Sequence, residues 1–179
     1  WEELWSGEMK NLSLRERLYA VDPGLRCCGM AYFENSLLQW ARLVETDAGG
    51  SEPYRWIAMS EELDLASDEV ICNARHEGAS VVVEFPKAYV GAKSGGDYED
   101  LLQLAAVVGA IRPTRIVRPH EWKGQMKKDP CNRRVLERLD GTERSHIEDA
   151  GAKTHNVLDA VGIGLYCLGR FERRRVFSR

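Results

Sequence analysis

The chain has 179 residues, 44% of them hydrophobic, a length and composition that suit a single domain with one sizeable core. Its longest mainly apolar run, residues 101–111, is shorter than the roughly 20 residues that a helix needs to cross a bilayer, and the first residues do not resemble a signal peptide. Five cysteines without paired C-x-x-C spacing argue against a disulfide framework or a zinc site. We therefore expect a reduced, cytoplasmic protein with no membrane partner.

The net charge of −3 hides an asymmetry between the two parts of the chain. Residues 1–111 carry 9 Lys/Arg and 19 Asp/Glu, whereas residues 112–179 carry 16 Lys/Arg and 9 Asp/Glu. Such a division suggests a basic surface for a polyanion on one side of the molecule. Two solvated faces with no binding role would give the same counts.

In chain order, residues 1–17 form a polar N-terminal arm, residues 18–170 the folded domain, and residues 171–179 a basic tail. Short apolar runs bounded by turn residues predict strands at 18–21, 26–33, 37–44, 80–84 and 114–117. Helical spacing predicts helices at 61–78, 98–111, around 135–139 and at 154–170. Asp97 and Thr154 are the expected N-caps of the second and the last of these helices.

This order, three strands and then strands alternating with helices, indicates an α/β fold. We expect a mixed five-stranded sheet, with three antiparallel and two parallel strands and helices on both faces.

Three acidic residues occupy informative places in this scheme. Asp22 ends the first strand, Glu84 ends the fourth, and Asp159 lies in the first turns of the last helix. If the first and fourth strands are parallel neighbours, their ends meet at the sheet edge where open α/β sheets bind ligands. Asp22 precedes Pro-Gly, so a simple turn-capping role is an alternative for it.

Three carboxylates that converge in a cleft repel one another unless cations lie between them. Mg²⁺ or Mn²⁺ are the natural cations, since both prefer oxygen ligands. Two such ions about 4 Å apart would suit phosphodiester hydrolysis.

The motifs VDPGLRCCGMAYF, VVVEFP, PHEWKGQMKK and AKTHNVLDAVGIGL, in this order, resemble RuvC-type Holliday-junction resolvases of the ribonuclease-H-like superfamily, in the small form found in phages. The resemblance covers about residues 18–170. It implies a structure-specific endonuclease that cuts branched, four-way DNA in pairs of nicks as a homodimer. It also implies that Asp22, Glu84 and Asp159 are catalytic carboxylates that bind Mg²⁺ or Mn²⁺.

In that family a fourth metal ligand, Asp or His, usually lies three residues before the helix Asp. Here that position is Asn156, and His155 lies four before. Both share a helix face with Asp159, so either could reach the metal. We favour His155, because histidine is the commoner ligand and proton carrier.

The resemblance also implies DNA-contacting and catalytic basic residues. Lys123, Lys127 and Lys128 match the place where the family uses lysines near the scissile phosphate, and Lys127 or Lys128 could stabilise the charge that develops there. Further DNA contacts are expected from Lys87, Tyr89, Lys93, Arg133 and Arg134. Each of these basic residues could instead be a solvated surface residue.

Other functions remain open from the sequence. A ribonuclease H or a transposase-like nuclease would share the carboxylates but differ in substrate, and a non-catalytic DNA-binding module would not need all three. An ATP-binding protein of the actin-like fold would need a second phosphate loop and a longer chain. The apolar helix 98–111 favours a dimer, which suits a two-fold-symmetric junction.

Overall fold

The computed structural model describes residues 17–46, 55–66, 78–85 and 98–171. They contain one five-stranded sheet in the order β3-β2-β1-β4-β5. Its strands are β1 (Arg17–Asp22), β2 (Cys27–Glu34), β3 (Leu37–Glu45), β4 (Ser80–Glu84) and β5 (Arg115–Val117). Strands β1, β2 and β3 pair antiparallel, whereas β4 pairs parallel with both β1 and β5. The predicted mixed sheet is confirmed.

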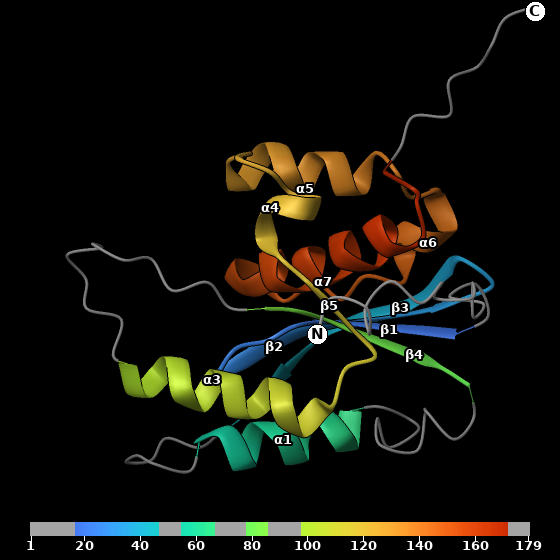
Figure 1. Cartoon of the computed structure of the whole chain (residues 1–179). Helices are drawn as coiled ribbons and strands as arrows, with labels where there is room; N and C mark the ends of the chain where they lie inside the picture. The colour runs from blue at the N-terminus through green and yellow to red at the C-terminus, as the bar shows by residue number, and fades with distance from the viewer. Residues whose placement is uncertain (1–16, 47–54, 67–77, 86–97, 172–179) are drawn as a thin grey trace, which may run out of the picture.

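Helices cover both faces of this sheet (Figure 1). One face carries α1 (Arg55–Ala66) and α3 (Tyr98–Ile111). The other carries α7 (Thr154–Cys167), with α6 (Gly141–Ser145) against β3 and the short 3₁₀ helix η1 (Gly151–Lys153) just before α7. Helices α4 (Pro119–Trp122) and α5 (Lys128–Leu136) pack on α7 from the side away from the sheet (Figure 1). Successive side chains of β1 point to opposite faces of the sheet and so contribute to both cores. Leu18 and Ala20 pack toward α7, while Tyr19 and Val21 pack toward α1 and α3. No helix in these described ranges is long and apolar enough to span a membrane.

Helix α7 lies unusually close to the sheet because glycines occupy the points of contact. A Cβ added to Gly29 of β2 would lie 1.8 Å from the backbone oxygen of Asn156 in α7. On α7 itself, a Cβ at Gly164 would lie 2.1 Å from the Phe33 ring. Gly29 is paired with Asp22 across β1 and β2, so this close approach brings the first turns of α7 to the end of β1.

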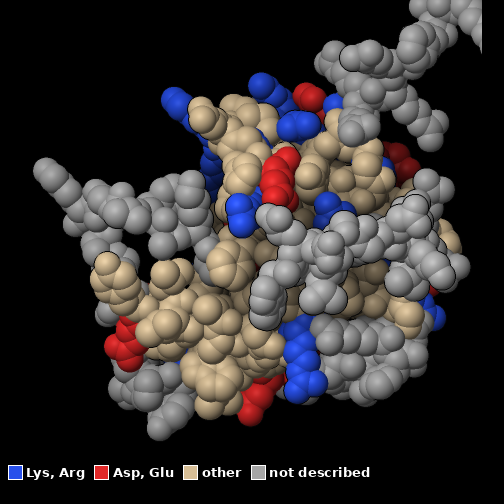
Figure 2. Space-filling view, in the orientation of Figure 1, with Lys and Arg blue, Asp and Glu red and all other residues tan. Residues whose placement is uncertain are grey.

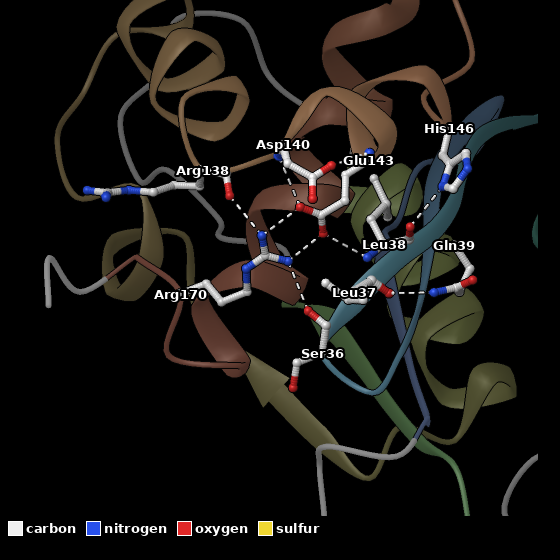
Figure 3. A network of polar contacts seen from close by, with 9 residues as sticks. All are labelled: Ser36, Leu37, Leu38, Gln39, Arg138, Asp140, Glu143, His146 and Arg170. Atoms are coloured by element: carbon white, nitrogen blue, oxygen red, sulfur yellow. Dashed lines mark hydrogen bonds and ion pairs between the residues drawn. The ribbon is translucent and has the colours of Figure 1, made fainter.

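A partly buried ion pair holds the other end of this layer (Figure 3). Arg170, just after α7, donates to both carboxylate oxygens of Glu143 in α6, at 2.5 and 2.7 Å. The same guanidinium donates to the backbone oxygens of Ser36 and Arg138, while Glu143 accepts from the backbone N–H of Leu38. Glu143 is 3% exposed, and despite the opposing effect of burial these hydrogen bonds hold its pKa below the usual range. The network joins the β2–β3 turn, the α5–α6 region and the end of α7.

Several element boundaries differ from the prediction. Helix α1 begins at Arg55 rather than residue 61, because Met59 and Leu63 form one buried stripe on the sheet; residues 67–77 lie outside the described part. Helix α5 starts at Lys128 rather than near 135, since Pro130 falls in its first turn, where a helix tolerates proline. Helix α7 ends at Cys167, shortly before Gly169, which has a φ of +69°.

Two predicted caps and the two terminal segments complete the comparison. Thr154 does not cap α7: Lys153 is at the N-cap, and the Thr154 hydroxyl instead accepts from the backbone N–H of Ala150. Asp97 lies outside the described residues, as do residues 1–16 and 172–179 of the predicted arm and tail. Phe171, placed in the tail by the sequence, is buried and stacks with Trp122.

We predict that Gly29→Ala destabilises the protein by about 1–3 kcal/mol, because the added methyl group must push α7 away from β2. Urea unfolding followed by circular dichroism measures the change. Gly141→Ala in α6 is the control: nothing lies within 4 Å of its added Cβ, so stability should change by less than about 1 kcal/mol. Equal effects of the two substitutions would contradict a tight contact at Gly29.

Candidate active site

The ends of β1 and β4 bring two acidic residues together. The strands are parallel and in register, with Val21 opposite Val83, so Asp22 and Glu84 follow at the same edge of the sheet. Ala20 and Val82, two residues earlier on each strand, belong to the core beneath α7. By strand alternation, both carboxylates therefore lie on the α7 side of the sheet.

Helix α7 adds Asp159, and the residue after α4 adds a positive charge. The Nζ atom of Lys123 lies 3.3 Å from Oε2 of Glu84 and 3.6 Å from Oδ2 of Asp159. One ammonium group thus bridges a carboxylate of the sheet and a carboxylate of the helix. These side chains are largely buried, with exposed fractions of 25% for Lys123, 12% for Glu84 and 18% for Asp159.

Trp122 fixes the orientation of Glu84. Its indole Nε1 donates to Oε2 of Glu84 at 2.6 Å, and its ring stacks on Phe171. Gly162 of α7 leaves space for this ring, since a Cβ there would lie 2.3 Å from it. The sequence analysis did not single out Trp122. The feature that could have identified it is an indole directly before Lys123 and shortly after β5, because a buried indole needs a hydrogen-bond partner.

Burial and mutual repulsion make it unfavourable to ionise the three carboxyl groups of the site. The pKa of Asp22 is raised well above its usual range by burial and by the nearby charges of Asp159 and Glu84, with Lys123 opposing. Burial also raises the pKa of Glu84 and of Asp159, in each case against the lowering effect of Lys123. Burial alone would lower the pKa of Lys123, but the three carboxylates outweigh it and raise that pKa, so the ammonium form persists.

The donor set suits a hard divalent cation, because carboxylate oxygens are the preferred ligands of Mg²⁺ and Mn²⁺. The raised pKa of each carboxylate is the expected result of packing acids where a cation would relieve the repulsion. As the side chains stand, no group of three His, Cys, Asp or Glu among the described residues converges closely enough to hold a metal ion. The ammonium group of Lys123 takes up the space between two of the three acids.

The two candidates for a fourth ligand differ in their contacts. Nδ1 of His155 lies 3.0 Å from the backbone oxygen of Ala152, which can only accept, so Nδ1 carries a hydrogen, and in the neutral imidazole Nε2 is then the acceptor. When the ring is protonated instead, His155 lies close enough to Asp159 for its positive charge to lower the pKa of that acid. The side-chain amide of Asn156 instead donates to Sγ of Cys27 at 3.2 Å, which turns it toward the start of β2.

The structure places the remaining predicted residues as follows. Lys127 and Lys128 are exposed at the start of α5, and the charge of Lys128 lowers the pKa of Asp159. Arg133 is exposed and pairs with Glu137, whereas Arg134 packs over the Phe171 ring, 4.4 Å from its centroid. Lys87, Tyr89 and Lys93 lie outside the described residues.

Basic side chains gather on the side of the molecule formed by α4 and α5, around a small acidic group (Figure 2). The exposed basic residues of this region are Arg118, Lys127, Lys128 and Arg133. Among them, Lys128 lies close enough to Asp159 to lower the pKa of that acid, so this positive surface extends to the carboxylates.

No family model and no curated protein sequence matches the chain. Two solved structures of RuvC from Thermus thermophilus share its fold. The first, in complex with a Holliday junction substrate, is 17% identical, with a TM-score of 0.57 over 87% of this chain and 97% of that one. The second is 15% identical, with a TM-score of 0.52 over 86% of this chain and 97% of that one. The predicted RuvC-like, ribonuclease-H-like fold is therefore confirmed, and identities this low show the fold alone.

We predict that Asp22→Asn stabilises the metal-free protein at pH 7, by on the order of 1 kcal/mol. The raised pKa of Asp22 means that ionising this acid costs stability in the folded state; that cost grows as the pH rises above the unfolded value of about 4. The advantage of the variant should therefore shrink as the pH falls toward about 4. Thermal unfolding between pH 4 and 8 in EDTA tests this.

Glu137→Gln is the control, because this exposed acid pairs with Arg133 at the surface and should change stability by less than about 1 kcal/mol. An Asp22→Asn protein that is less stable than the wild type at pH 7 would contradict the repulsion inferred at the site.

Proposed function

We propose that the protein is a metal-dependent endonuclease that resolves four-way DNA junctions, of the small RuvC type found in phages, acting in the cytoplasm of a bacterial cell. One observation carries this: Asp22 and Glu84 end neighbouring parallel strands, and α7 brings Asp159 to the same edge, within the fold of RuvC. Retention of all three acids at a cost in stability favours a catalytic site over a DNA-binding module without activity.

Asp22, Glu84 and Asp159 would hold the cations, two Mg²⁺ or Mn²⁺ ions in our proposal. Bound there, the cations would activate water and stabilise the leaving oxygen of a phosphodiester. His155 is the fourth ligand or proton carrier that we favour, since its Nε2 is available while Asn156 is engaged with Cys27. Trp122 would keep Glu84 in place throughout.

The basic surface would bind the DNA backbone. Lys127 and Lys128, exposed at the start of α5, are the candidates for contacting the scissile phosphate, because Lys128 already acts electrostatically on Asp159. Arg133 would bind phosphates further along α5, whereas Arg134 would contribute less because its guanidinium packs on Phe171. Lys87, Tyr89 and Lys93 remain proposed DNA contacts on sequence grounds.

A ribonuclease H or a transposase-like nuclease would use the same carboxylates on a different substrate. Two features favour a four-way junction. The similarity spans 97% of a RuvC chain whose structure was solved with a Holliday junction substrate. An exposed apolar stripe on α3 also offers a face for a two-fold dimer.

That stripe consists of Tyr98, Leu102, Ala105 and Gly109. Tyr98 is 85% exposed and Leu102 71% exposed, and all four lie on the same side of the helix. Exposed apolar surface of this kind is typical of contacts between proteins. Val108 is 5% exposed and packs on the sheet, so it belongs to the core of the monomer.

We predict Mg²⁺-dependent cleavage of a labelled four-way junction, and little cleavage of a matched linear duplex or an RNA–DNA hybrid. Asp22→Asn, Glu84→Gln and Asp159→Asn should each lower the single-turnover rate at least about a hundredfold while leaving junction binding intact. Glu137→Gln, at the exposed C-cap of α5, should cut normally. Preferential cleavage of the hybrid would instead favour a ribonuclease H, and cleavage of none would favour a binding module.

We also predict that Leu102→Glu converts a dimer into a folded monomer at micromolar concentration, since it places a charge in the apolar stripe. Sedimentation velocity and circular dichroism together measure mass and folding. Val108→Glu is the contrasting variant, and it should unfold the protein because it buries an unpaired charge. A wild-type protein that sediments as a monomer would exclude this interface.

A further inference from the structure

The acidic site already contains a cation that the chain itself supplies. The ammonium group of Lys123 lies within 3.6 Å of oxygens from Glu84 and Asp159, and its charge also lowers the pKa of Asp22 against the raising effect of burial. A metal ion held by Glu84 and Asp159 would need the space between them that this ammonium group occupies. Mg²⁺ binds its oxygen ligands at about 2.0–2.1 Å, so the ammonium group and a bridging ion cannot both fit between these oxygens.

We propose that Lys123 is the resident counter-cation of the metal-free site, and that a divalent cation binds by displacing its ammonium group. This inference rests on the proposed function, because it takes the three carboxylates as the metal site. The site would then exchange the ammonium group for a metal ion, and its carboxylates would have a positive charge beside them before and after the exchange.

The surroundings of Lys123 suit such an exchange. Its backbone is at the end of α4, and the next residue, Gly124, has a φ of +60° with nothing within 4 Å of an added Cβ. Residues 124–130 are exposed, so solvent lies beside the long lysine stem. A lysine ammonium is a point charge on a flexible stem, and it can leave more easily than a guanidinium fixed by two hydrogen bonds.

Trp122 would stay in place while its neighbour moves. The indole is 2% exposed, donates to Glu84 and packs between Gly162 and Phe171. Glu84 would therefore keep its orientation when the ammonium group leaves. Trp122 would then keep the metal ligand Glu84 in position, while the adjacent Lys123 would occupy the metal position until the ion binds.

The first test measures Mn²⁺ affinity without DNA, by electron paramagnetic resonance of free Mn²⁺ during a titration. Lys123→Met should bind Mn²⁺ at least about tenfold more tightly than the wild type, because the ion no longer competes with a resident charge. Lys127→Met removes the same charge from an exposed lysine on the same side of the molecule, and its Kd should stay within about twofold of the wild type. An unchanged or weaker affinity of Lys123→Met would overturn the proposal.

The second test uses the wild-type protein and so does not depend on the folding of a variant. Lysines are acetylated briefly with and without Mn²⁺, and each site is quantified by mass spectrometry. Mn²⁺ should raise the labelling of Lys123 at least about threefold relative to Lys127, since the displaced ammonium group moves toward solvent. Equal labelling in both conditions would show that Lys123 is a fixed structural ion pair.

The results also separate this proposal from the proposed function. If the wild type and Lys123→Met bind Mn²⁺ equally well, the exchange is wrong while the metal site stands. If neither binds Mn²⁺ at millimolar concentration and the junction is not cut, both proposals fail.

Discussion

Three carboxylates meet at one edge of the sheet, and each is harder to ionise there than in water, because burial and neighbouring charges raise its pKa. The rest of the fold has to offset this unfavourable arrangement. Lys123 supplies one charge, and Trp122 supplies a hydrogen bond to Glu84. A site of this kind persists when it is held by a well-packed frame, since the acids themselves add no stability at neutral pH.

That frame is the contact of α7 with the sheet. At one end, Gly29 lets the helix backbone approach the strand that pairs with β1, which brings Asp159 toward Asp22. At the other end, Arg170 and Glu143 join the end of α7 to the β2–β3 turn and to α6 (Figure 3). Between them, Gly162 and Gly164 admit the rings of Trp122 and Phe33. Helix α7 is therefore positioned by close packing on Gly29 at its first turns and by the Arg170–Glu143 ion pair at its end.

The sequence predicted what depends on local patterns. Runs of apolar residues predicted all five strands, and an acid at the end of two of them predicted where Asp22 and Glu84 would meet, because neighbouring parallel strands end at one edge. Contacts between distant segments were beyond such patterns. Nothing local to Trp122 shows that it reaches Glu84, 38 residues earlier, or that Gly162 leaves the space for it. The start of α5 was missed because its polar, proline-containing first turn resembles a loop.

The position of Lys123 also depends on contacts between distant segments, which local sequence patterns do not predict. From the sequence it was one of three lysines that could bind a phosphate, but in the structure it is the one that lies between the carboxylates, while Lys127 and Lys128 stay exposed. If a metal displaces its ammonium group, that group moves toward the basic surface of α4 and α5, where the DNA backbone is proposed to lie. Metal binding would then add a positive charge to the DNA-binding face and neutralise the acids beside it. Both changes favour the approach of a polyanion, so metal and DNA should each strengthen the binding of the other.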